Sequence, residues 1–204
     1  GRLRSVGPLA TLEETPAEPG GPSHEPGADQ GAVAPRPAPA VSASGDGTKA
    51  PLDGVTVLEF ATIIAAPLGV SFLGDLGARV IKVEPVGGDP YRGMGIHGIQ
   101  AARTNQSKES IALDLKTPEA REIVQKLVAQ ADVIIHNYRP GVPERLGIGY
   151  EDAKRLNPKI VYVSVNGYGP KGPGAHRPST HPIPGAALGG ALAQVGKGRP
   201  PGFC

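Results

Sequence analysis

The fold is indicated by two short apolar segments, VTVLEF at positions 55–60 and RVIKVE at positions 79–84, and by the residues between them. Both segments are rich in β-branched residues, which favour strands. Between them, residues 67–76 read as a helix, because Pro67 suits a first helical turn and Gly77 can follow a last one. A strand, a helix and a second strand in this order predict a βαβ unit with parallel strands.

The same alternation continues along the chain. Further strands are predicted at residues 110–115, 133–136 and 160–165, and helices at residues 117–129 and 151–156, with Thr117 as an N-cap. These strands are continuously apolar, which is typical of strands that are buried on both faces. We therefore predict an α/β fold with a Rossmann-like, open and mainly parallel sheet, in which ligands bind at the carboxyl ends of the strands.

Glycine and proline, which break helices and strands, are unevenly distributed. The chain has 204 residues, of which 30 are Gly and 23 are Pro. Residues 1–30 are expected to be disordered or the tail of a preceding domain, and residues 31–50 form a Pro/Ala/Gly-rich linker. Residues 51–204 then form the N-terminal part of an α/β domain. A second Gly/Pro-rich zone, residues 167–204, follows the last predicted strand, so its loops are expected at the ligand-binding end of the sheet.

Charge and composition exclude several classes of partner. The formal net charge is +2 and no run of basic residues stands out, which disfavours nucleic acid and membrane surfaces as partners. A single cysteine excludes an internal disulfide and a zinc site made of cysteines, and the spacing of the 5 histidines fits no metal signature. No apolar stretch approaches the roughly 18 residues of a membrane span, and no signal pattern is present. We expect a cytoplasmic location.

Two segments, residues 93–98 and 167–172, match the dinucleotide-binding pattern G-x-G-x-x-G. That pattern requires a strand before it and a helix after it, so that backbone N–H groups point at a pyrophosphate. The first match follows no clear strand, and the second contains Pro170 and precedes no helical pattern. The turn after the first strand, residues 61–66, contains no glycine. The sequence therefore does not support a nicotinamide or flavin dinucleotide site.

Candidate chemical groups lie near the predicted strand ends. His181, in the Gly/Pro-rich loop beyond the last strand, is a possible active-site loop residue, although a structural role is an equal alternative. No G-x-S-x-G nucleophile elbow occurs. Several basic residues are either ordinary solvated charges or face an anionic ligand such as a nucleotide phosphate. They are Lys82, Lys108, Lys116, Arg139 and Arg145.

Taken in order, several segments suggest a family. They are LDGVTVLEF (52–60), LGARVIKVE (76–84), SIALDLK (110–116) and NYRPG (137–141). This succession resembles the class III coenzyme A transferases, the CaiB/BaiF family, from residue 51 to about residue 201. The resemblance implies a Rossmann-like large domain, which is incomplete here, and an interlocked homodimer. It also implies an enzyme that moves coenzyme A (CoA) between an acyl-CoA donor and a carboxylate acceptor.

The resemblance further implies which residues contact CoA, which would be a substrate rather than a tightly bound cofactor. Carried over by position, these contacts fall on Ile64, Ala65, Asn105, Lys108, Leu113, Lys116, Asn137, Tyr138, Arg139 and Arg145. The chain departs from the family at two positions. Glu109 replaces a usual Arg, and Pro85 stands where an Arg that contacts CoA often occurs. No metal site is implied.

The family's catalytic group is an Asp that attacks the acyl-CoA, forming an acyl anhydride and then an enzyme thioester. By spacing, this Asp would lie several residues beyond Cys204, so we expect no catalytic residue and no activity in this chain alone. One alternative is a non-catalytic, CoA-binding half that completes a dimer or a tandem fusion, since residues 7–16 resemble the tail of another copy of the fold. A second is an α-methylacyl-CoA racemase, although Thr180 stands where racemases carry a His.

Overall fold

The computed structural model describes residues 50–94, 99–180, 196 and 198, all of which belong to one structural unit, Gly45–Cys204. The tail and linker predicted for residues 1–50 therefore lie outside the described residues, apart from Ala50.

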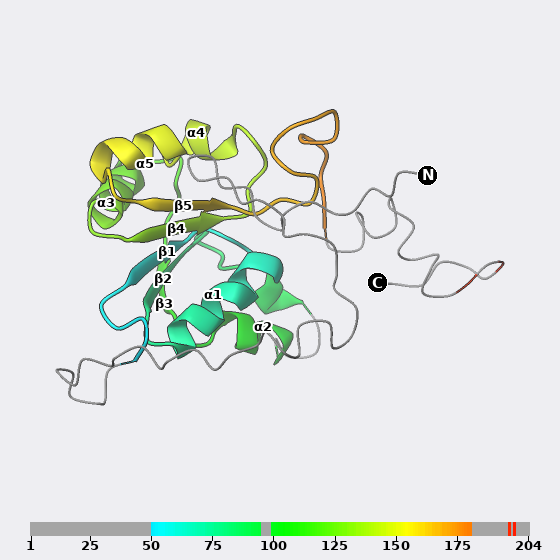
Figure 1. Cartoon of the computed structure of the whole chain (residues 1–204), viewed down its shortest axis with the longest axis horizontal. Coiled ribbons are helices and arrows are strands. Elements are labelled where there is room, and N and C mark those ends of the chain that lie inside the picture. Colours follow the sequence, from blue (N-terminus) through cyan, green and yellow to red (C-terminus); the bar gives the residue numbers. More distant parts are fainter. Residues whose placement is uncertain (1–49, 95–98, 181–195, 197, 199–204) are drawn as a thin grey trace, which may run out of the picture. The chain divides into compact units, whose positions relative to one another are not determined.

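A five-stranded parallel sheet forms the centre of this unit (Figure 1). Its strands are β1 (Thr56–Glu59), β2 (Arg79–Glu84), β3 (Glu109–Ala112), β4 (Val133–His136) and β5 (Val161–Ser164). The strand order is β3-β2-β1-β4-β5, and each neighbouring pair is parallel. The prediction of an open, parallel, Rossmann-like sheet is confirmed. Because the order reverses at β1, a crevice is expected where the chain leaves β1 and β4.

Helices cover both faces of the sheet, as Figure 1 shows. Helices α1 (Ala65–Asp75) and α2 (Ile99–Asn105) lie on one face. The other face carries α3 (Pro118–Val128), α4 (Val142–Leu146) and α5 (Tyr150–Leu156). A short 3-10 helix, η1 (Pro90–Gly93), follows β2.

Alternate residues of β1 pack into two separate cores. Val57 packs with Val70 of α1, whereas Leu58 belongs to a larger cluster with Val124 and Val128 of α3. The predicted burial on both faces is thus confirmed for the central strands. It is wrong for the edge strands β3 and β5, where Val161, for example, is 56% exposed. An edge strand has only one neighbouring strand, and most residues of β3 and β5 remain partly or fully exposed.

Most predicted elements have the expected type, with shifted ends. Helix α1 begins at Ala65, so Pro67 lies inside the first turn, where its missing N–H has no intrahelical partner to lose. Strand β3 begins one residue earlier than predicted and ends at Ala112, because the chain then turns toward α3. The predicted cap of α3 is confirmed, since the Thr117 hydroxyl accepts the N–H of Ala120 at 3.3 Å.

Helices α2 and α4 were not predicted from the sequence. Helix α4 has five residues and lies between Gly141 and Gly147, which both adopt positive φ angles. Periodicity cannot reveal so short a helix.

Candidate functional site

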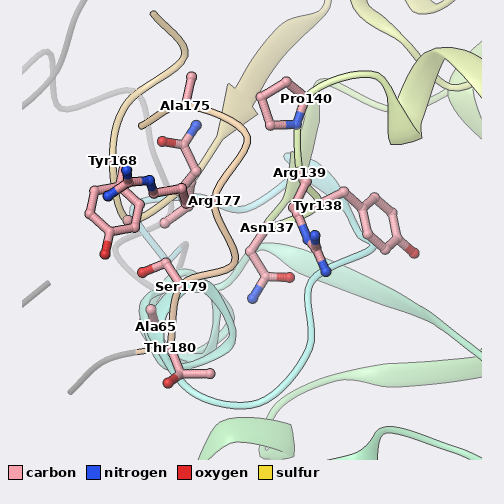
Figure 2. A pocket seen from close by; sticks show the side chains of 13 residues that line it. Ala65, Asn137, Tyr138, Arg139, Pro140, Tyr168, Ala175, Arg177, Ser179 and Thr180 are labelled. Atoms are coloured by element: carbon pink, nitrogen blue, oxygen red, sulfur yellow. The ribbon is translucent and has the colours of Figure 1, made fainter. Parts of the chain in front are cut away.

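A pocket of about 190 Å³ lies at the carboxyl end of the sheet, where β1 and β4 lead into their loops. We call it pocket 1 (Figure 2). Its lining residues come from the start of α1, from the loop after β4 and from the chain that follows β5. They are Ala65, Asn137, Tyr138, Arg139, Pro140, Val165, Asn166, Gly167, Tyr168, Ala175, Arg177, Ser179 and Thr180. This is the position at which open α/β sheets bind ligands.

Polar groups enter pocket 1 from opposite sides. Figure 2 shows Ser179 and Thr180 beside Ala65, with the Asn137 amide facing them from the loop after β4. Two guanidinium groups, those of Arg139 and Arg177, also line the pocket. Among the described lining residues there is no carboxylate, so the walls of pocket 1 suit an anionic ligand.

A second pocket, of about 350 Å³, lies next to the first, and we call it pocket 2. It is lined by the last two residues of β2, by residues that follow β2 and β3, and by two residues from the β4–α4 region. They are Val83, Glu84, Pro85, Val86, Leu113, Asp114, Leu115, Lys116, Tyr138 and Leu146. Tyr138 belongs to both pockets, and in Figure 2 its ring points away from Tyr168 and Arg177. One extended ligand could therefore reach both pockets past this side chain.

A partly buried aromatic cluster holds the backbone at Tyr138. The His136 ring stacks on Tyr138, with centroids 5.8 Å apart, and meets Tyr162 edge-on at 5.3 Å. Burial lowers the pKa of His136 to about 4, so the imidazole is neutral at pH 7. Its Nδ1 accepts the N–H of Tyr138 at 3.2 Å, which requires the ring proton to lie on Nε2. His136 therefore has a structural role.

Four buried charges form a cluster beneath the first turn of α1. Lys82 Nζ lies 2.8 Å from Asp89 Oδ2, and Lys108 Nζ lies 2.7 Å from Glu59 Oε2. All four side chains are at most 1% exposed. Burial raises the pKa of the Glu59 carboxyl and lowers the pKa of the Lys108 ammonium, while the ion pair between them opposes both shifts.

Seven of the residues predicted to contact CoA lie at the two pockets or directly beside them. Ala65, Asn137, Tyr138 and Arg139 line pocket 1, and Leu113, Lys116 and Tyr138 line pocket 2. Ile64 is the N-cap of α1, next to Ala65, and is 37% exposed.

The other predicted contacts lie elsewhere. Arg145 is an exposed residue of α4, one position before Leu146 of pocket 2. Lys108 lines neither pocket, because its ammonium binds Glu59 and the Pro67 carbonyl. Asn105 donates to the Ala101 carbonyl at 2.8 Å and also lines neither pocket. His181 lies outside the described residues.

Several lining residues were missed by the residue-level predictions, notably Asn166, Tyr168 and Arg177. All three follow β5, and Tyr168 and Arg177 lie in the Gly/Pro-rich zone that the sequence places at the ligand-binding end. The available signal for Arg177 was an Arg in the Gly/Pro-rich loop region that follows the last predicted strand. Asn166 Oδ1 is buried and has no hydrogen-bond partner among the described residues.

The described residues contain no group of three or more His, Cys, Asp or Glu side chains that could hold a metal ion. Over the same residues, no helix has the length and apolar character needed to cross a membrane.

The structure is that of an α/β protein with two pockets at the carboxyl edge of a parallel sheet, and comparison with known proteins identifies its family. The model of CoA-transferase family III matches residues 52–203. The chain therefore belongs to CoA-transferase family III, and the resemblance inferred from the sequence is confirmed.

Curated relatives of this chain are also named CoA-transferases. The acetyl-CoA:oxalate CoA-transferase of Acetobacter aceti is 41% identical over 150 residues, which cover 71% of this chain and 39% of that protein. The succinyl-CoA:glutarate CoA-transferase of Mus musculus is 41% identical over 145 residues, covering 68% of this chain and 33% of that protein. The chain thus spans between a third and two fifths of the length of these relatives.

Solved structures agree with this assignment. A CaiB/BaiF family protein from Brucella suis superimposes with a TM-score of 0.69 and 38% identity, over 76% of this chain and 44% of that one. A hypothetical protein from Mycobacterium tuberculosis gives the same TM-score with 35% identity and the same coverage.

Proposed function

We propose that this chain forms the CoA-binding part of a CoA transferase, which moves CoA from an acyl-CoA donor to a carboxylate acceptor. One observation carries the proposal. Residues from three separate segments, assigned to CoA by family resemblance alone, gather at two adjacent pockets at the carboxyl edge of the sheet. The names of the relatives, which include acetyl-CoA:oxalate and succinyl-CoA:glutarate CoA-transferases, support the same reaction class.

Each pocket offers groups that suit a different part of the ligand. Lys116 and the apolar Leu113 and Leu115 of pocket 2 can bind a phosphate and an adenine face, respectively. Pocket 1 offers the guanidinium of Arg139, which suits a carboxylate, and the second N–H of the Asn137 amide, whose first N–H and oxygen bind Thr62. We place the acyl end of the ligand in pocket 1.

The chemical step needs a carboxylate that pocket 1 does not contain among its described lining residues. We propose that an Asp beyond this chain supplies it. The Asp carboxylate attacks the thioester carbonyl and the C–S bond breaks, which forms an acyl–aspartyl anhydride and releases the CoA thiolate. The thiolate then attacks the aspartyl carbonyl, which releases the free acid and leaves an aspartyl-CoA thioester. The acceptor carboxylate then attacks that thioester, which releases the CoA thiolate again and forms a mixed anhydride between the acceptor and the Asp. The thiolate finally attacks the acceptor's acyl carbon in this anhydride, which forms the product acyl-CoA and regenerates the Asp.

Because none of the described lining residues of pocket 1 is a carboxylate, a second candidate is also favoured. In it, the chain is a non-catalytic half that binds CoA and completes an interlocked homodimer or a tandem partner. The two candidates differ in one result. A longer protein that contains this chain, given an acyl-CoA and treated with hydroxylamine, yields a trapped enzyme hydroxamate only if the Asp mechanism operates.

CoA binding to the 204-residue chain tests the site itself. Calorimetric titration with CoA should show saturable binding that weakens as salt rises. Lys116→Met and Arg139→Met should each weaken binding about tenfold or more, because a hydrogen bond to a charged group contributes roughly 1.5–3 kcal/mol.

Lys159→Met is the matched control. It removes the same charge from an exposed residue that precedes β5, at the end of the strands opposite the pockets. The affinity of this variant for CoA should stay within twofold of that of the parent chain. Equal losses in all three variants, or no binding by the parent, would contradict the assignment of the site.

A further inference from the structure

The turn that joins β1 to α1 has an unusual backbone conformation. Ile63 adopts a φ angle of 71°, in the left-handed region that side chains branched at Cβ strongly disfavour. Apart from glycines, Ser107 is the only other described residue with a positive φ. A non-glycine residue in this region persists only where its surroundings enforce it.

Asp89 supplies one of the contacts that enforce it. The Ile63 N–H donates to both Asp89 carboxylate oxygens, each at 3.2 Å. Asp89 is 2% exposed and is itself oriented, since it accepts the Tyr91 N–H at 2.9 Å and pairs with Lys82 at 2.8 Å. The carboxylate that holds Ile63 therefore cannot turn away without breaking an ion pair inside the protein.

The remaining polar groups of the turn are held in the same way. Lys82 Nζ donates to the Ala61 carbonyl at 2.9 Å. Asn137 binds Thr62 twice, because its Oδ1 accepts the Thr62 N–H at 3.0 Å and its Nδ2 donates to the Thr62 carbonyl at 2.8 Å. Side chains from β2, from the loop after β2 and from the loop after β4 thus hold three consecutive residues.

We propose that Asp89, oriented by Lys82, is a positioning residue that keeps the β1–α1 turn in the conformation that binds the ligand. The turn carries Ala65 onto the wall of pocket 1, while Asp89 and Lys82 line neither pocket. The proposal rests on the proposed function, since pocket 1 must bind CoA for the turn to matter. It differs from a purely structural role, in which Asp89 would stabilise the fold without affecting the ligand.

The size of the effect follows from the conformation of Ile63. Left-handed backbone at a non-glycine residue is disfavoured by a factor of about 5 to 150. If the Asp89 contact is weakened, the turn relaxes, and the apparent Kd rises in inverse proportion to the fraction of molecules that keep the competent conformation. We expect Asp89→Asn to raise the Kd for CoA about tenfold.

The test is rescue by glycine, which adopts a positive φ without strain. We expect Asp89→Asn combined with Ile63→Gly to recover most of the lost affinity, as measured by calorimetric titration of the 204-residue chain with CoA. Asp89→Asn combined with Ile63→Ala is the matched control. Alanine removes the same side chain beyond Cβ but keeps the strain, so this variant should bind as weakly as Asp89→Asn alone. Urea unfolding of each variant separates affinity from stability.

Three results would overturn the proposal. They are an unchanged Kd in folded Asp89→Asn, equal rescue by Gly and Ala, or no rescue by Gly in a folded double variant. A parent chain that does not bind CoA would instead refute the proposed function. If Asp89→Asn does not fold, the single variants Ile63→Gly and Ile63→Ala test whether the conformation of Ile63 is enforced. Ile63→Gly must then unfold at a higher urea concentration than Ile63→Ala, and equal unfolding midpoints would refute the enforced conformation.

Discussion

Glu84, at the end of β2, should contribute strongly to the pH dependence of the stability of this domain. Glu84 Oε1 and Oε2 accept hydrogen bonds from Arg92 at 2.6 and 2.8 Å, and the Ser110 hydroxyl and the Asp89 N–H add two more. The Arg92 guanidinium is the main cause that lowers the pKa of Glu84 from its usual 4.5 to about 2. These contacts fix the start of the loop that carries Asp89 and lines pocket 2.

The magnitude follows from that change in pKa. A fall from 4.5 to about 2 corresponds to about 3 kcal/mol in favour of the ionised native state. Arg92 is 46% exposed, so solvent screens the interaction, and we expect about 2 kcal/mol in practice. Because the native pKa lies below the unfolded one, this stability is fully present above about pH 4.5 and is lost as the pH falls toward 2.

Urea unfolding of the parent and of Glu84→Gln at pH 7, 5, 4 and 3 measures this contribution. The variant cannot ionise at this position, so the difference in free energy of unfolding should shrink by about 1–2 kcal/mol between pH 5 and pH 3. Glu122→Gln serves as the control, because its ion pair with Lys126 is exposed on both sides and should contribute little. A difference between parent and Glu84→Gln that stays constant with pH would refute the reasoning.

Two further predictions concern the framework of the site. Leu58→Ala should lower the free energy of unfolding by about 2–5 kcal/mol, because Leu58 is 0% exposed in the larger core. Leu156→Ala, at a 40% exposed position, should lower it much less, and similar losses in urea unfolding would contradict the assignment of the core. Thr117→Ala should lower the free energy of unfolding by about 1 kcal/mol, because it removes the cap of α3. Thr117→Ser should restore most of this stability, and a Ser variant as unstable as the Ala variant would exclude the capping contact.

The parallel sheet could be predicted from the sequence because its central strands are buried on both faces. VTVLEF and RVIKVE are rich in β-branched residues, and the helix between them has a proline in its first turn and a glycine after its last. The edge strands and the short helices give weaker signals, because the residues of β3 and β5 are mostly exposed and a helix of five residues is too short to show its period. Strand β3 was therefore misplaced by up to three residues, and α4 was missed.

The candidate site could be predicted in part, because family resemblance assigns residues by position and the fold then brings them together. Asn137, Tyr138 and Arg139 directly follow β4, so their place at the carboxyl edge follows from the fold. Lys108 shows the limit of that reasoning. Whether a lysine near a strand end faces a ligand or a buried Glu59 depends on contacts between segments 49 residues apart.

The buried charges at the end of the sheet could not be predicted by pattern, since each one alone reads as solvated. Glu59 and Lys82 are paired in register across β1 and β2, and both are buried. Two apolar residues would fill the same positions at no electrostatic cost, and buried ion pairs often add little stability over such a replacement. An apolar pair, however, would leave the Ala61 carbonyl without its donor and Asp89 without its cation. The charges are therefore better explained by the turn they hold at pocket 1 than by the stability of the strands that carry them.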